Sequence, residues 1–121
     1  MAVSEWTDPL TLWGCDTVGA LRRLLQDNAF YLECLTAFHQ DHRFALLGRQ
    51  LREGDVAGAF SSAHALKGAA ANLGLTPLYH ALCPLVEQLR MGEMADAALY
   101  TEVMAQYQRM GDCLQKLPPL P

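Results

Sequence analysis

The sequence predicts an all-α protein, an up-down four-helix bundle with a short additional N-terminal helix. Three observations lead to this fold class. Helix-favouring Ala, Leu, Gln, Arg and Met are abundant among the 121 residues, whereas Val is scarce and Ile is absent. The two-residue alternation typical of strands is missing, and apolar residues instead recur at helical spacing between Gly and Pro stops. The length fits a single domain.

The N-terminal segment, residues 1–15, is predicted to form an arm or a short helical turn. Its tryptophans, Trp6 and Trp13, are expected to pack across one end of the bundle. A first short helix is expected to begin at the capping candidates Asp16 or Thr17 and to end at the Asp27-Asn28 pair. Its predicted apolar stripe consists of Val18, Leu21, Leu24 and Leu25.

A long second helix is predicted over residues 28–51, because apolar side chains follow one line along this segment. The line contains Tyr31, Leu35, Phe38, His42 and Ala45, and it is widened by Leu32, Leu46 and Leu47. At about 1.5 Å per residue, such a helix is on the order of 35 Å long. Glu53-Gly54-Asp55 then supplies a helix stop, a left-handed glycine and a new N-cap, so the next helix is expected to run antiparallel.

Three more helices are predicted after this turn. The third runs from Val56 to about Leu73, and the fourth from the cap and first-turn proline of Thr76-Pro77 to about Met91. The last covers roughly residues 93–117. Pro84 removes one backbone hydrogen bond from the fourth helix and is expected to kink it without breaking it. The bundle is therefore assigned to residues 16–117, with a short tail at 118–121.

Charge and hydropathy argue against two classes of partner. The formal net charge is −4 and no basic run is present, which argues against a phosphate-backbone surface for nucleic acid. Charged residues interrupt each apolar stretch well before the roughly 18–20 residues that span a bilayer, so no membrane insertion is expected. The first ten residues lack the basic region of a signal peptide. We therefore expect a cytoplasmic protein. We also expect it to be a monomer.

The four cysteines are widely spaced and form no C-x-x-C pair. Cys15, Cys34, Cys83 and Cys113 are therefore interpreted as small buried thiols in a reducing compartment rather than as metal ligands or a redox couple.

The predicted third helix has two different faces. One is a stripe of small residues and leucines suited to close packing inside a bundle: Ala59, Ser62, Leu66, Ala69, Ala70 and Leu73. The other carries His64, with Lys67 one turn later and Gly68 at i+4. Glycine inside a helix costs about 1 kcal/mol relative to alanine, so Gly68 indicates a need for open space over the imidazole. A neutral imidazole is a nucleophile, and this arrangement suits a transiently phosphorylated histidine.

The sequence around this histidine resembles the signature of histidine-containing phosphotransfer (Hpt) domains, broadly H-x-L-K-G-x-x-x-x-L-G. The matching residues are His64, Leu66, Lys67, Gly68, Leu73 and Gly74. The preceding long helix, the Glu53-Gly54-Asp55 turn and the downstream residues 82–92 are also similar to the family's usual layout, and the resemblance covers roughly residues 16–117. The family's frequent serine just after the motif glycine is replaced by the alanines of residues 69–71.

The resemblance implies a phosphorelay intermediate. His64 accepts a phosphoryl group from a receiver-domain aspartate and passes it to another receiver, Lys67 stabilises the phosphoryl group, and Gly68 gives access to the imidazole. The chain is then a phosphocarrier rather than an enzyme and needs no cofactor, because the magnesium ion belongs to the partner receiver. The partners are receiver domains of response regulators or a hybrid sensor histidine kinase. The surface expected to dock them contains Ala57, Phe60, Ser61 and Ala71.

Two other interpretations remain open at this point. The same bundle could be an adaptor or inhibitor that binds a kinase or receiver without being phosphorylated. His39 and His42 have the i, i+3 spacing that can hold a metal on one helix face, but no third ligand follows from the spacing, and a polar helix surface is the simpler interpretation.

Overall fold

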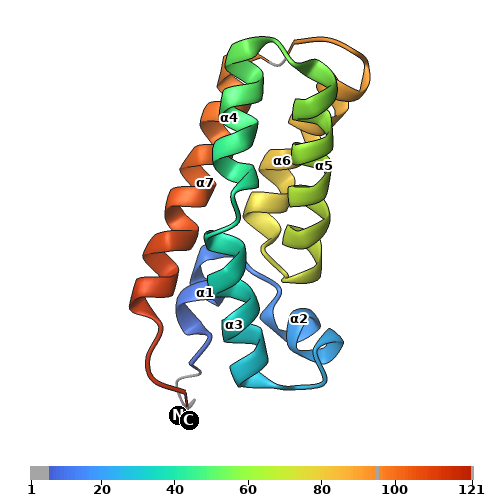
Figure 1. Cartoon of the computed structure of the whole chain (residues 1–121). Helices are drawn as coiled ribbons and strands as arrows, with labels where there is room; N and C mark the ends of the chain where they lie inside the picture. Colours follow the sequence, from blue (N-terminus) through green and yellow to red (C-terminus); the bar gives the residue numbers. More distant parts are fainter. Residues whose placement is uncertain (1–5, 95, 121) are drawn as a thin grey trace.

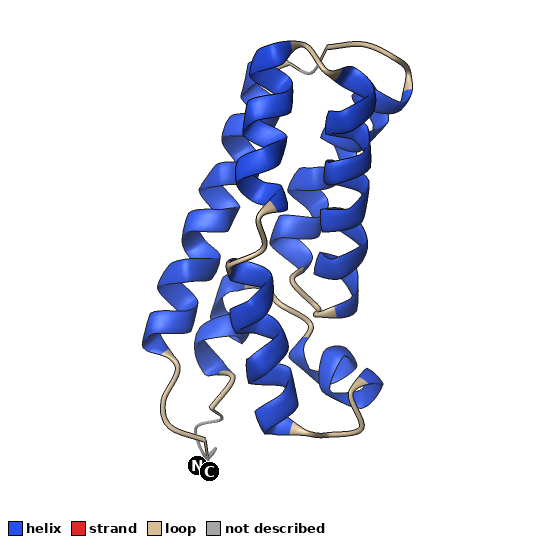
Figure 2. Ribbon diagram, in the orientation of Figure 1, coloured by secondary structure: helices blue, strands red, loops and turns tan. Residues whose placement is uncertain are grey.

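The computed structural model describes residues 6–94 and 96–120, and within these ranges the chain forms helices and no strand (Figure 2). The all-α prediction is therefore confirmed. The helices are α1 (Asp8–Trp13), α2 (Thr17–Arg23), α3 (Asn28–His39), α4 (Arg43–Glu53), α5 (Val56–Asn72), α6 (Thr76–Arg90) and α7 (Ala97–Lys116).

Four helices, α4 to α7, run alternately up and down and form the bundle (Figure 1). Helix α5 packs against both α4 and α6, and α6 packs against α7. Helix α3 lies below α4 and continues its column along α7, while α1 also packs on α7. The long α7 thus runs beside both α3 and α4 (Figure 1), and α5 is held between α4 and α6.

The prediction of one continuous helix over residues 28–51 is wrong. Helix α3 ends at His39 and α4 begins at Arg43. The Asp41 carboxylate accepts a hydrogen bond from the backbone N–H of Arg43 at 2.9 Å, and its Oδ1 lies 3.4 Å from the guanidinium Nε of the same residue. Asp41 therefore competes for backbone groups that a continuous helix would use internally.

The break also changes which side chains face the core. His42 and Ala45, predicted on the buried line, are exposed, whereas Phe44 is 3% exposed. The rings of Phe38 and Phe44 meet edge-on across the break, with centroids 5.2 Å apart. The interruption rotates α4 relative to α3, so each helix turns its own aromatic residue inward.

The N-terminal elements differ from prediction in their exposed residues. Asp16 caps α2 as expected, accepting a hydrogen bond from the Gly19 N–H at 3.0 Å. Of the predicted stripe, Leu21 and Leu24 pack against the core, but Val18 and Leu25 do not, because they are 66% and 89% exposed. Helix α2 ends at Arg23, and Leu25 has a φ of 56°, outside the helical region.

Both tryptophans contact the bundle, as predicted. The Trp13 indole N–H donates a hydrogen bond to Gln106 of α7 at 2.8 Å. Trp6 is buried, and its ring stands edge-on to Tyr31 of α3 with centroids 6.0 Å apart. These contacts attach the N-terminal segment to α3 and α7.

The last two helices are close to their predicted bounds. Helix α6 continues through Pro84, whose ring is exposed, so the expectation that Pro84 does not break this helix is confirmed. Leu75, not Thr76, occupies its N-cap position. Helix α7 begins later than predicted, after Asp96, whose side chain accepts a hydrogen bond from the Ala98 N–H. No helix in the described ranges is long and apolar enough to cross a membrane.

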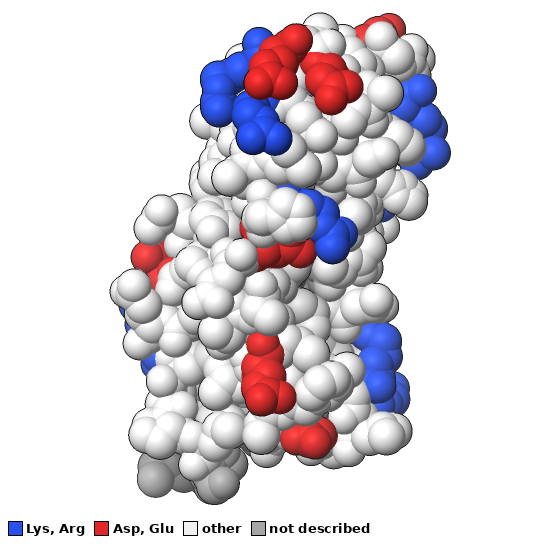
Figure 3. All heavy atoms as spheres, in the orientation of Figure 1, with Lys and Arg blue, Asp and Glu red and all other residues white. Residues whose placement is uncertain are grey.

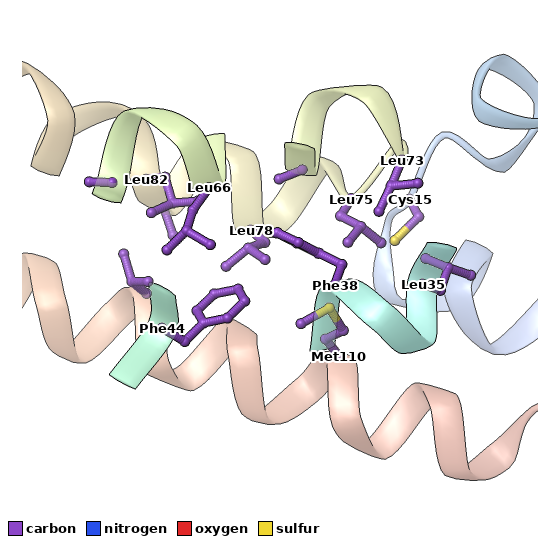
Figure 4. Packing of buried hydrophobic residues seen from close by; sticks show 14 of the residues in the cluster. Cys15, Leu35, Phe38, Phe44, Leu66, Leu73, Leu75, Leu78, Leu82 and Met110 are labelled. Atoms are coloured by element: carbon purple, nitrogen blue, oxygen red, sulfur yellow. The ribbon is translucent and has the colours of Figure 1, made fainter. Parts of the chain in front are cut away.

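The hydrophobic core runs along the inside of the bundle. Figure 4 shows Phe38, Phe44, Leu66, Leu78 and Met110, from five different helices, converging on one region. Burial of such side chains stabilises a fold by roughly 1.5–3 kcal/mol each before entropy is counted. All four cysteines are free thiols. Cys15 and Cys113 are buried as predicted, but Cys34 and Cys83 are partly exposed.

Candidate functional site

The candidate site lies on α5, whose two ends are fixed by local sequence. Gly54 adopts a left-handed φ of 73° that ends α4, and the Asp55 side chain accepts a hydrogen bond from the Gly58 N–H at 2.9 Å. At the other end, Gly74 has a φ of 69° and its carbonyl accepts a hydrogen bond from the Asp16 N–H at 2.8 Å. The helix is therefore held at a defined length and register.

The packed face of α5 agrees with the prediction in most positions. Its buried residues are Ala59, Ser62, Ala63, Leu66 and Ala70. Ala69 was predicted on this face but is only partly buried. Ser62 donates a hydrogen bond to the Gln50 side chain at 2.7 Å, which ties α5 to α4. With one face fixed, the rotation of α5 determines what the opposite face presents.

The opposite face presents an accessible histidine. His64 is exposed, and a methyl group built at Gly68 would have no neighbouring heavy atom within 4 Å. The space beside the imidazole is therefore open, as the glycine suggested. Among the residues predicted to dock a partner, Ala57, Ser61 and Ala71 are exposed. Because these side chains are small, they do not block the access of a partner to His64.

Phe60 lies beside His64 on α5, and Arg90 of α6 lies beside Phe60. The rings of Phe60 and His64 are one turn apart on α5, with centroids 5.5 Å apart at an interplanar angle of 60°. The Arg90 guanidinium of α6 lies 5.1 Å from the centroid of the Phe60 ring, within the range of a cation–π contact. Arg90 is also paired with Glu87, with Nε and Oε1 3.2 Å apart. Phe60 is partly buried and is held against α6.

Lys67 also contacts α6. Its ammonium nitrogen lies 5.8 Å from the centroid of the Tyr79 ring. The neighbouring Cys83 side chain and, to a smaller extent, desolvation raise the pKa of the Tyr79 hydroxyl above its usual value. Sequence reasoning missed both Tyr79 and Arg90, because their positions beside α5 depend on how α6 packs and not on a local motif.

The charges around the bundle show no dominant patch on the face that Figure 3 displays. Acidic and basic side chains are scattered there over a mostly uncharged surface.

His39 and His42, whose spacing would allow a metal-binding pair, make different contacts. The imidazole of His39 stacks on Tyr107 of α7 with centroids 4.8 Å apart, whereas the side chain of His42 is 79% exposed, beyond the helix break. The described residues contain no group of three or more His, Cys, Asp or Glu side chains suited to hold a metal. The two histidines therefore lie in different environments.

Comparison with known proteins identifies the family of this chain. Residues 31–117 match the Hpt domain family. Searches of curated proteins and of solved structures gave no significant match. Hpt domains are phosphocarrier modules that take part in histidine phosphotransfer with receivers and kinases in phosphorelays. Because the match covers most of the chain and includes the helix that exposes His64, this chain belongs to the Hpt domain family.

Proposed function

We propose that His64 accepts a phosphoryl group from a receiver-domain aspartate and passes it to the aspartate of a second receiver. The observation that carries this proposal is the exposed imidazole of His64 beside the open surface at Gly68, on a helix within the Hpt match. A receiver needs open space around the imidazole, because its aspartate is recessed in a pocket and the surrounding protein surface must come close to His64.

The proposed reaction is a direct transfer between two nucleophiles. One nitrogen of the neutral imidazole attacks the phosphorus of the aspartyl phosphate with its lone pair. A new P–N bond forms as the P–O bond to the aspartate breaks, and the carboxylate leaves with the bonding electrons. The other ring nitrogen keeps its proton. Onward transfer is the reverse of these steps with a second receiver.

This chain's own contribution is positioning and charge. A rigid α5 holds the imidazole in place, which is a large part of catalysis in phosphoryl transfer. Lys67 supplies a cation within one turn of the phosphorylated nitrogen, and Gly68 leaves room for the partner. The magnesium ion is assigned to the receiver and not to this chain.

The proposed docking surface consists of Ala57, Phe60, Ser61 and Ala71 around His64. It has an aromatic side chain at its edge and small residues elsewhere, and such a contact suits a transient interface at the small end of the size range. We assign the protein to a reducing compartment, the cytoplasm, because all four cysteines are free thiols. A monomer is sufficient for this role.

The direct test is labelling by a phosphorylated receiver domain. Wild-type protein is expected to take up label that is acid-labile and alkali-stable, as phosphohistidine is, and the His64→Gln variant is expected to take up none. His80→Gln is a matched control, because His80 is an exposed histidine on α6. Labelling that persists in His64→Gln would refute the site. If no receiver from the source organism labels the wild type, the adaptor interpretation is favoured instead.

A further inference from the structure

The ammonium group of Lys67 has a defined neighbour on a different helix. Its nitrogen lies 5.8 Å from the centroid of the Tyr79 ring, and Lys67 itself is partly buried between α5 and α6. None of the ion pairs formed by the described residues includes Lys67. The ring is therefore the group that orients this cation in the structure.

An aromatic face suits a lysine that must stay available. A carboxylate partner would neutralise the charge and compete with an incoming phosphoryl group, whereas a ring attracts the cation weakly and leaves its three N–H donors free. A lysine side chain also has about 2 kcal/mol of rotamer entropy, so confining it to one side of the helix favours any contact made there. Residues three apart on a helix face one another, which places Lys67 within reach of His64.

We propose that Tyr79 is a positioning residue for Lys67, holding its ammonium group on the α5–α6 face beside His64 so that it can contact the transferred phosphoryl group. This inference rests on the proposed function of His64. The aromatic ring of Tyr79 makes the contact with Lys67, and the hydroxyl takes no part in it. A tyrosine hydroxyl is protonated at neutral pH, so the contact with Lys67 is one between a cation and a neutral ring.

A double-mutant cycle tests this coupling. Tyr79→Leu removes the ring and is expected to slow transfer from a phosphorylated receiver to His64 by about two- to fivefold, the range of an exposed cation–π contact. Tyr79→Phe keeps the ring and is expected to transfer at the wild-type rate. In a Lys67→Met background, Tyr79→Leu is expected to have no additional effect, because the cation that the ring positions is gone. Phe30→Leu, an exposed aromatic on α3, is the matched control and is expected to have no effect.

A second measurement reports the placement of Lys67 without phosphorylation. The ε-methylene protons of Lys67 are expected to show an upfield ring-current shift in the NMR spectrum that persists in Tyr79→Phe and is lost in Tyr79→Leu. If wild-type His64 takes up no label, the proposed function fails while this shift still reports the placement. Two outcomes would overturn the positioning role when His64 is labelled. In one, Tyr79→Leu slows transfer equally with and without Lys67. In the other, Tyr79→Leu changes neither the transfer rate nor the chemical shift.

Discussion

The hydroxyl of Tyr107 on α7 donates a hydrogen bond to the backbone carbonyl of His39, with the two oxygens 2.8 Å apart. His39 is the last residue of α3, so this carbonyl has lost the partner that a continuing helix would supply. The Tyr107 ring also stacks on the His39 imidazole and contacts Phe44, with centroids 4.8 and 4.4 Å away. One side chain of α7 therefore stabilises both sides of the break between α3 and α4.

Replacing Tyr107 by phenylalanine isolates this hydrogen bond, because the ring contacts are retained. We expect Tyr107→Phe to lower the free energy of unfolding by about 1 kcal/mol, since the His39 carbonyl is left without its donor in a partly buried place. Urea unfolding followed by circular dichroism measures the change. An unchanged midpoint would show that water satisfies the carbonyl equally well.

The same contact explains why the break was not predicted from the sequence. Apolar periodicity continues through residues 28–51, and nothing in it marks an interruption. The deciding groups are the short carboxylate of Asp41 and the hydroxyl of Tyr107, which is distant in sequence. Such long-range satisfaction of backbone groups depends on tertiary packing. In contrast, the Gly54-Asp55 turn was predicted correctly, because a left-handed glycine and an N-cap act locally.

Two left-handed glycines should differ in their tolerance of alanine. Gly54 has a φ of 73° with nothing within 4 Å of a built methyl group, so Gly54→Ala should cost about 1–2 kcal/mol of backbone strain alone. Gly74 has a φ of 69°, and a methyl group there would run into the backbone carbonyl of Asp16. Gly74→Ala should cost about 1–3 kcal/mol more than Gly54→Ala, because backbone atoms must also move.

Thermal or urea unfolding of the two glycine variants, measured side by side, checks this order. Each variant serves as the control for the other, since both place alanine in the same backbone conformation. Equal losses of stability would mean that the contact between Asp16 and the Gly74 turn rearranges without cost.

The candidate site was predictable only in part, for the same physical reason. His64, Lys67 and Gly68 lie on one helix, so their common face follows from their spacing. Tyr79 and Arg90 complete the surroundings from α6, and their contacts with Lys67 and Phe60 depend on the crossing of two helices. Sequence periodicity defines which face of a helix is apolar, but it does not determine which side chain of a neighbour lies beside a given residue.

Stability should fall at alkaline pH because of Cys15. Burial, and to a smaller extent the nearby Cys113, raise the pKa of this thiol, and a backbone hydrogen bond with Thr76 lowers it, so that the pKa rises from 9.0 to about 12. The unfolded chain therefore loses this proton at a lower pH than the folded protein. The contribution is fully present below about pH 9 and is lost as the pH rises towards about 12, at up to about 1.4 kcal/mol per pH unit.

Urea unfolding between pH 7 and 11, under reducing conditions, measures this slope. Cys15→Ala is expected to flatten it, whatever its effect on stability at neutral pH. Burial also raises the pKa of Tyr31, which continues to contribute a decrease at the alkaline end in both proteins. Identical slopes for the wild type and Cys15→Ala would contradict the prediction.

Phe60 is expected to contribute to partner binding more than to folding. Its ring is partly buried, lies between the His64 imidazole and the Arg90 guanidinium, and stays accessible from the proposed docking surface. Aromatic anchor residues of an interface often contribute about 2 kcal/mol or more to binding. Phe60→Ala should therefore raise the Kd for an unphosphorylated receiver by about tenfold or more. Calorimetric titration measures the Kd, and Phe30→Ala on α3 is the matched control. Equal Kd values for the two variants would show that Phe60 does not contribute to partner binding.

Gly68 gives the sharpest separation of folding from function. It lies in the middle of α5 with ordinary helical backbone and open space beside it, so Gly68→Ala should stabilise the protein by about 0.5–1 kcal/mol. The longer side chain of Gly68→Gln should fill the space over His64 and slow phosphoryl transfer from a receiver by about tenfold or more, since overpacked contacts typically cost about 1–3 kcal/mol. Both variants should therefore fold at least as well as the wild type.

Unfolding midpoints and transfer rates on the same samples measure the two effects. A Gly68→Gln variant that transfers at the wild-type rate would show that the partner does not approach His64 across this position, whereas a destabilised Gly68→Ala variant would show that another element packs there.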